Sequence, residues 1–202
     1  MQDISLIVVE GGSGTGKSSL ARSLQERFQP QQWLHFSFDT LLYCLPPSVL
    51  DMANQRNDWS AVDQNAITRS VYGCLRTLLD DGHRVIFDCV LMTERGAREL
   101  LTALQSYRPV LVRLTCSWDE IERRTIARGD RTIEEARRGF ETSGLCLTVD
   151  YEIDTTHRSS AEIAETLVPL IAGSSTHDAW QRSRDRLSSG STENRLDLNR
   201  KL

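Results

Sequence analysis

The stretch EGGSGTGKSS, Glu10 to Ser19, is the part of this sequence that decides its fold. It follows the apolar run ISLIVV at residues 4–9 and leads into Ser18 to Phe28, where large apolar residues recur at helical spacing. Glycine is costly inside regular structure but permits backbone conformations that other residues avoid. A strand, a glycine-rich turn with a lysine, and a helix together predict a loop whose backbone N–H groups surround a group with several negative charges.

Residues 11–18 match the pattern G-x-x-x-x-G-K-[ST], which is typical of loops that bind the phosphates of a nucleoside triphosphate. The lysine of such a loop reaches the β- and γ-phosphates, and the hydroxyl that follows it can ligate Mg²⁺. A glycine-rich turn without a ligand is the alternative, but the position between a strand and a helix favours binding. The expected nucleotide-binding residues are Gly11, Gly12, Ser13, Gly14, Thr15, Gly16, Lys17, Ser18 and Ser19.

Short apolar runs alternate with helix-period segments along most of the chain. The expected strands are residues 4–9, 33–38, 84–90, 110–116 and 150–153. Such alternation predicts an α/β fold with three layers, in which helices cover both faces of a five-stranded parallel sheet. Together with the loop, it predicts a P-loop NTPase fold of the nucleotide-kinase type. In such folds, ligands bind beyond the carboxyl ends of the strands.

Several segments between the strands carry helix signals. Residues 61–81 place apolar side chains on one face and stop at Gly82. The capping-box pattern, in which two side chains satisfy the free amides of a first helical turn, occurs three times, at residues 117–120, 132–135 and 159–162.

We expect one P-loop kinase domain over residues 1–172, with two specialised segments. Residues 46–60 show little periodicity, which makes about 44–70 the expected insert for binding an acceptor. The arginine-rich segment of about 123–142 is the expected lid. Residues 173–202 form a polar tail that is either disordered or a short amphipathic helix against the surface.

Two aspartates follow expected strands, so both should lie at the same edge of the sheet as the phosphate loop. Asp88 ends the run VIFD and suits a carboxylate that supports Mg²⁺ beside Ser18. Asp39 ends FSFD and suits a base that accepts the proton of an acceptor hydroxyl. The alternative for each is a helix N-cap, where aspartate is also favoured.

Four arginines lie in the segment ERRTIARGDRTIEE. Arg123 and Arg124 fit a solvated helix face with glutamate partners. Arg128 and Arg131 bracket a Gly-Asp turn between two expected helices, and they suit a lid that closes over a triphosphate and stabilises charge on the transferred group.

The composition of the chain argues against several classes of protein. A net charge of −4 gives no support for a general nucleic-acid or membrane-surface binder, and no apolar run approaches the ~20 residues of a membrane span. The first residues lack the pattern of a signal peptide. Five scattered cysteines without a C-x-x-C pair indicate reduced core thiols in a cytoplasmic protein. A homo-oligomer is left open.

The sequence resembles the chloramphenicol phosphotransferase family of small P-loop kinases. The stretches that carry the resemblance are GGSGTGKSSLARSLQ, WLHFSFDTLL with LPP after it, RVIFDCVL, RTIARGDR and DYEIDTTH, in this order over residues 4–170. The resemblance implies transfer of the γ-phosphate of ATP to a hydroxyl of an antibiotic, with Mg²⁺ as the metal. It implies that Asp39 is the base, that Arg128 and Arg131 are lid arginines, and that the segment IDTTH precedes the loop beside the adenine.

The chain also departs from the family pattern, which keeps other functions open. Cys89 stands where the family often has a second aspartate, and residues 50–70 are unlike the family's antibiotic pocket. The first alternative is a zeta-toxin-like kinase that acts on a sugar nucleotide or another metabolite. The second is a nucleotide-binding switch without transfer, although the chain lacks N-K-x-D, D-x-x-G and L-S-G-G-Q motifs.

Overall fold

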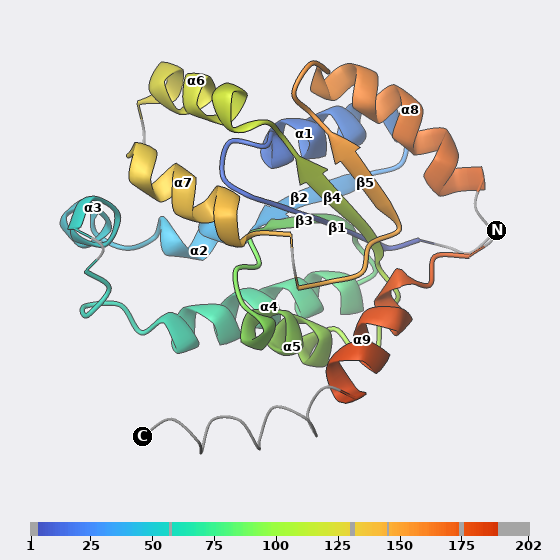
Figure 1. Ribbon diagram of the computed structural model, residues 1–202. Helices are drawn as coiled ribbons and strands as arrows, with labels where there is room; N and C mark the ends of the chain where they lie inside the picture. The colour runs from blue at the N-terminus through green and yellow to red at the C-terminus, as the bar shows by residue number, and fades with distance from the viewer. Residues whose placement is uncertain (1–3, 57, 130–131, 145, 174–175, 190–202) are drawn as a thin grey trace.

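A five-stranded parallel sheet forms the centre of the protein, as the computed structural model shows for residues 4–56, 58–129, 132–144, 146–173 and 176–189 (Figure 1). The strand order is β2-β3-β1-β4-β5, and every pairing is parallel. The strands are β1 (Leu6–Gly11), β2 (Trp33–Ser37), β3 (Arg84–Cys89), β4 (Val110–Thr115) and β5 (Tyr151–Asp154). The predicted fold class and its five strands are confirmed.

Helices cover both faces of the sheet because side chains of a strand alternate between them. On one face, Ile7 and Val9 pack with α1 (Lys17–Arg27) and α8 (Ser160–Gly173). On the other face, Leu6 and Val8 pack with α4 (Gln64–Asp80), α5 (Glu94–Ala103) and α9 (Ala179–Ser189). Figure 1 shows the first pair of helices above the sheet and the other three below it. All three central strands are buried on both faces, as expected for a parallel sheet.

The segment between β2 and α4 is more regular than its sequence suggests. It contains a short helix, α2 (Asp39–Leu42), and a longer one, α3 (Pro47–Arg56), where little periodicity is visible. Proline at the first helical position suits the start of α3, because its fixed φ matches a helix and no N–H is needed there. The expected helix at 61–81 begins later, at Gln64, because the Asp63 side chain accepts a hydrogen bond from Ala66 N and caps it.

The segment predicted to be a lid, about 123–142, contains the second half of α6 (Trp118–Arg128) and α7 (Ile133–Thr142). Two of the three expected capping boxes form, at Thr132 with Glu135 and at Ser159 with Glu162. The third was wrong, because the Ser117 side chain makes no capping hydrogen bond. Glu120 instead pairs with two guanidinium groups of its own helix, and charge-assisted hydrogen bonds of this kind are stronger than those to a neutral amide.

Helix α9 matches the short amphipathic helix that the sequence gives as one alternative for the tail after residue 172, but it packs into the core and is not peripheral. Trp180 is 3% exposed and Leu187 is 4% exposed, and both lie in the same apolar cluster as the strands. The Asp150 carboxylate accepts a hydrogen bond from Ala179 N at 3.1 Å, which fixes the start of the helix. Residues 179–189 are therefore an integral part of the domain.

Two further expectations concern the cysteines and the membrane. All five cysteines are free, and three of them are buried as expected, but Cys44 and Cys74 are exposed and do not belong to the core. Within the described part of the chain, none of the helices has the length and apolar character that crossing a bilayer requires.

The burial of Trp180 gives a stability prediction. Trp180→Ala should lower the free energy of unfolding by about 3–5 kcal/mol, because it leaves a large cavity beside the sheet. Leu170→Ala, at a half-exposed position of α8, is the control and should change it by about 0.5 kcal/mol or less. Urea unfolding measures both. A loss below about 1 kcal/mol for Trp180→Ala would show that α9 is dispensable.

Candidate active site

The phosphate loop joins β1 to α1, and its glycines are required by its path. Gly14 and Gly16 have φ values of 85° and 91°, in the left-handed region where side chains are strained. At Gly11 a Cβ atom would lie only 2.6 Å from the carbonyl oxygen of Leu114 on β4. The loop therefore lies closely against the sheet, and its last glycine leads directly into the first turn of α1.

Side chains of the loop converge on one backbone oxygen. Lys17 Nζ donates to Gly12 O at 3.0 Å, and Thr15 Oγ1 donates to the same oxygen at 2.8 Å. The ammonium group of Lys17 is thereby held across the mouth of the loop. A cation in this place beside the N-terminus of a helix is suited to bind phosphate.

Asp88 is the centre of a buried polar cluster at the end of β3. Its side chain is 5% exposed, and it accepts hydrogen bonds from Ser18 Oγ at 2.9 Å, Ser37 Oγ at 2.7 Å and His35 Nε2 at 2.7 Å. Burial is the largest influence and would raise the pKa of Asp88. The hydrogen bonds and the charge of Lys17 together outweigh it and hold this pKa below its usual value. The carboxylate is therefore kept ionised beside the phosphate loop.

The pair Ser18 and Asp88 fits the needs of Mg²⁺. Both supply oxygen donors, and Mg²⁺ usually takes only one or two ligands from the protein and the rest from phosphates and water. Among the described residues no cluster of three or more His, Cys, Asp or Glu side chains could hold a metal by itself. The residues present thus suit a metal that arrives with a nucleotide, as the sequence predicts.

Asp39 is the first residue of α2 and is joined to Asp88 through Ser37. The backbone N of Asp39 donates to Ser37 Oγ at 3.3 Å, and the same hydroxyl donates to Asp88. Asp39 is exposed, and the charges of Asp39, Asp88 and Lys17 all act on the buried thiol of Cys89. The two aspartates therefore share one edge of the sheet with the loop, one buried and one open to solvent.

A pocket of about 430 Å³ lies between the start of α1, α6 and the segment that joins β5 to α8. Arg124 holds these parts together. Its guanidinium donates to Gly14 O at 3.1 Å and to Thr155 O at 2.8 Å. Thr155 is 3% exposed and donates in turn to Thr15 O. Three more arginines, Arg123, Arg128 and Arg158, line the pocket, which makes it strongly cationic.

The structure describes only one of the two predicted lid arginines. Arg128 lines the pocket, whereas Arg131 lies outside the described residues. The sequence suggested a solvated helix face for both Arg123 and Arg124. This interpretation holds for Arg123, which is exposed and paired with Glu120. Arg124 also forms the expected pair with Glu120, but it is partly buried and bonds Gly14 O and Thr155 O, so the solvated face was wrong for it. The buried threonine that positions Arg124 is far away in the sequence, so helix periodicity alone could not have identified it.

Helix α7 lies directly on the phosphate loop. A Cβ atom at Gly12 would meet Ser143 Oγ at 2.9 Å and Gly139 O at 3.1 Å, so this approach requires glycine at residue 12. A Cβ atom at Gly139 would lie 3.5 Å from Ser13 N, in direct contact with the loop. The C-terminal end of α7 therefore covers the first residues of the loop.

A buried ion pair below the loop was not predicted from the sequence. Glu10 is the second-last residue of β1 and is 1% exposed, and its carboxylate accepts a hydrogen bond from Arg113 Nε at 2.7 Å. Burial, the largest influence, raises the pKa of Glu10, although Arg113 acts in the opposite direction. Arg113 also bonds Glu152 and Leu147 O, and so ties β1, β4, β5 and the segment after α7 together. A glutamate at the end of an apolar strand was the visible signal for this pair.

Comparisons with known proteins bear out the resemblance seen in the sequence. A model of the family described as chloramphenicol phosphotransferase-like protein matches residues 4–171. The chain belongs to this family. A Mycobacterium tuberculosis relative named "Putative O-phosphotransferase" is 30% identical over 204 residues, which cover 92% of this chain and 90% of the relative.

Other known proteins are similar to this chain at lower sequence identity. A guanylate kinase of Thermobifida fusca is 28% identical over 187 residues, covering 85% of this chain and 92% of that enzyme. The solved structure of the Mycobacterium tuberculosis APS kinase, in complex with AMPPNP and APS, has a TM-score of 0.60 at 17% identity and covers 84% of this chain and 98% of its own. The protein is thus a P-loop phosphotransferase with a kinase fold.

The neighbouring arginines of α6 allow a matched test of the pocket. Arg124→Ala should weaken binding of ADP about 10- to 100-fold, because it removes charge-assisted hydrogen bonds that join the loop to the β5–α8 segment. Arg123→Ala is the comparison on the same helix. Arg123 also lines the pocket, but its side chain is 68% exposed and paired with Glu120, so its loss should weaken the affinity only about two- to fivefold. Calorimetric titration measures both. Equal effects of the two substitutions would contradict the role given to Arg124.

The lowered pKa of Asp88 predicts how acid acts on stability. The ionised carboxylate stabilises the fold fully above its unfolded pKa of about 3.9, and this contribution is lost as the pH falls through the lower folded pKa. The difference in unfolding free energy between the wild type and Asp88→Asn should therefore be about 1–3 kcal/mol at pH 5 and shrink toward pH 2. Urea unfolding at stepped pH measures it. A difference that stays constant below about pH 4 would contradict the assignment.

Proposed function

We propose that this protein is an ATP-dependent O-phosphotransferase that moves the γ-phosphate to a hydroxyl of a small molecule, with an antibiotic as the first candidate acceptor. One observation carries the proposal. A continuous set of hydrogen bonds runs from Ser18 through Asp88 and Ser37 to Asp39. These bonds connect Ser18 and Asp88, which suit the metal of a nucleotide, to the backbone N of Asp39. The exposed carboxylate of Asp39, at the same edge of the sheet, suits an acceptor.

The nucleotide would occupy the loop and the arginine pocket. The loop amides and Lys17 would bind the phosphates, and the pocket beside Arg124 and Thr155 would take the base and ribose. Arg128, which lines the pocket, and the neighbouring Arg131 would stabilise charge on the transferred group. The family's use of ATP and the cationic lining support this placement.

Ser18 and Asp88 would hold Mg²⁺, Ser18 directly and Asp88 through the shell around it. When bound, Mg²⁺ neutralises charge on the β- and γ-phosphates. The low pKa of Asp88 keeps its carboxylate ionised for this role. His35 and Ser37 fix the orientation of that carboxylate through hydrogen bonds at 2.7 Å each.

Asp39 would accept the proton of the acceptor hydroxyl as its oxygen attacks the γ-phosphorus. The bond between the γ-phosphorus and the bridging oxygen breaks in the same step, and ADP leaves. Asp39 suits this role because it is exposed at the carboxyl edge of the sheet while its backbone is fixed by Ser37. A base in such a position contributes about 10²- to 10⁴-fold to the rate.

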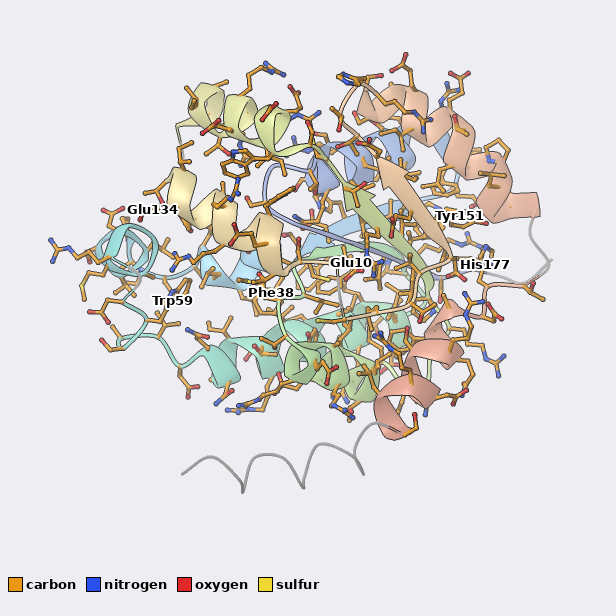
Figure 2. The ribbon with its side chains drawn as sticks, in the orientation of Figure 1. Glu10, Phe38, Trp59, Glu134, Tyr151 and His177 are labelled. Atoms are coloured by element: carbon orange, nitrogen blue, oxygen red, sulfur yellow. The ribbon has the colours of Figure 1, made fainter. Side chains whose placement is uncertain are left out.

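The acceptor would be bound by the region that contains α2, α3 and the segment before α4. Figure 2 shows Trp59 and Glu134 on the side of the molecule opposite Tyr151 and His177, which lie toward the amino end of β5. The labelled side chain of Phe38, next to Asp39 in the chain, lies between Trp59 and the strand end that carries Glu10 (Figure 2). This location supports our proposal that residues 44–70 bind the acceptor.

Two other kinase functions are weighed against this proposal. A nucleoside monophosphate, as the name of the guanylate kinase relative suggests, offers a phosphate that needs no base and that the Asp39 carboxylate would repel. A zeta-toxin-like kinase of a sugar nucleotide or other metabolite also uses a hydroxyl and differs only in the acceptor. We place the reaction in the cytoplasm, where ATP and reduced thiols occur.

Asp39→Asn tests the base directly. Phosphoryl transfer should fall about 10²- to 10⁴-fold while the affinity for ADP changes less than about twofold, because the change removes a proton acceptor and no nucleotide contact. Asp81→Asn, at an exposed position after the end of α4 and outside residues 44–70, is the matched control and should keep full activity. Normal transfer by the Asp39→Asn variant would refute the assignment of the base.

The acceptor can be identified by incubating the protein with γ-labelled ATP or GTP and a panel of hydroxylated antibiotics, metabolites, UDP-sugars and GMP. The measurement is which of these compounds takes up the label. We expect label from ATP on at least one antibiotic or metabolite hydroxyl and none on GMP. Transfer only to a UDP-sugar would favour the zeta-toxin-like function, and transfer to GMP would contradict the proposal. Nucleotide binding without any transfer would indicate a switch.

A further inference from the structure

A second cationic groove lies away from the candidate active site. It is about 660 Å³ in volume and is formed by α4 and α5, on the sheet face opposite α1 and α8. Figure 1 shows these two helices together below the sheet. The groove shares no residue with the arginine pocket. Nothing in the proposed transfer reaction uses it.

The charge of the groove is strongly positive. Arg69 and Arg76 line it from α4, and Arg95 and Arg98 line it from α5, with Glu99 as the one acidic residue. Glu99 is already paired with Arg95 at 2.9 Å. Neither Arg69 nor Arg76 forms an ion pair within the described ranges of the chain. Arg98 lies 3.8 Å from Glu94, so among the described residues the excess positive charge of the groove is that of Arg69 and Arg76, in a chain with a net charge of −4.

The spacing of these two arginines suits an anion. Arg69 and Arg76 are seven residues apart, so they lie on the same face of α4 about 10 Å apart along its axis. Guanidinium groups donate two parallel hydrogen bonds to phosphate or carboxylate oxygens, which makes them the preferred partners of such groups. A small anion between them could bond to both.

The floor between the two arginines is open and apolar. Gly73 lies in the interior of α4, where glycine weakens a helix relative to alanine. A Cβ atom there would have no heavy atom within 4 Å, so packing does not require glycine. Beside it, the buried ring of Tyr72 is fixed against Phe38 and Phe87 at centroid distances of 6.4 Å each. The missing side chain leaves room for a flat ligand.

We propose that the α4–α5 groove binds a small organic phosphate, with the phosphate between Arg69 and Arg76 and a planar or apolar body over Gly73 and Tyr72. The carboxylates of Asp80 and Glu94 lie one helical turn from Arg76 and Arg98 along their own helices, and they would repel a long polyanion such as nucleic acid. The site is separate from the phosphate loop and does not depend on the proposed reaction.

Isothermal titration and ¹⁵N NMR of the full chain test the site with three probes: 1-naphthyl phosphate, inorganic phosphate and 1-naphthol. We expect naphthyl phosphate to bind at least tenfold more tightly than either of the other two and to shift the amides of Arg69 and Gly73. The double variant Arg69→Glu with Arg76→Glu should lose at least tenfold in affinity. The double variant Arg22→Glu with Arg108→Glu, at two exposed arginines outside the groove, is the charge-matched control and should change it less than twofold.

A second variant tests the groove without reversing any charge, so that the test does not depend on the folding of the charge-reversed protein. Gly73→Leu fills the open floor and improves helix propensity, so its melting temperature should not fall below that of the wild type. It should still lose at least tenfold in affinity for naphthyl phosphate. Lys17→Ala should keep the binding, because it changes only the phosphate loop.

Each remaining outcome overturns the proposal. Loss of binding in Lys17→Ala but not in the groove variants would place the ligand in the phosphate loop. Equal affinity for inorganic phosphate would leave no role for the floor at Gly73. Tighter binding of a 20-nucleotide single strand, with shifts at Arg69 and Arg76, would make the groove a nucleic-acid surface. The absence of any shift in the groove would show that it binds none of these probes.

Discussion

The rest of the site depends on one buried carboxylate, that of Asp88. Its two oxygens accept hydrogen bonds from three side chains, which come from the first turn of α1 and from β2. A buried carboxylate without partners would be protonated or would destabilise the fold, so these bonds and the charge of Lys17 make its ionised form possible. The same bonds fix the phosphate loop relative to the strand that leads to Asp39.

The two aspartates at this edge differ in environment, and the difference explains why they suit different roles. Asp88 is enclosed and has its oxygens occupied by fixed donors. Asp39 begins a short helix at the surface, where its backbone is tied to Ser37 and its side chain is exposed. A metal needs a carboxylate held in one orientation, whereas a base must be open to the molecule that gives up its proton.

The loop is held from below and from above by parts of the chain that are distant in sequence. Below it, Glu10 and Arg113 form a buried ion pair that joins three strands. Above it, α7 approaches so closely that glycine is required at residue 12. At its side, Arg124 connects it to Thr155. Such support restricts the loop to the conformation that binds phosphate, and this preorganisation favours both binding and transfer.

The sequence by itself determined the sheet, the phosphate loop and the placement of two aspartates at its edge, because strand alternation and glycine-rich turns are local properties of the chain. It left α3 unpredicted and placed α9 outside the core, since contacts with distant segments are not visible in the local sequence. It gave Glu120 a capping role although Arg123 and Arg124 are only three and four residues away, because spacing alone does not decide which partner a side chain takes. The role of Arg124 and the open groove at Gly73 were decided only by tertiary structure. Both arise where segments far apart in the sequence meet. The strength of a hydrogen bond or of a charge–charge interaction depends on the distance between the groups in space and not on their order along the chain.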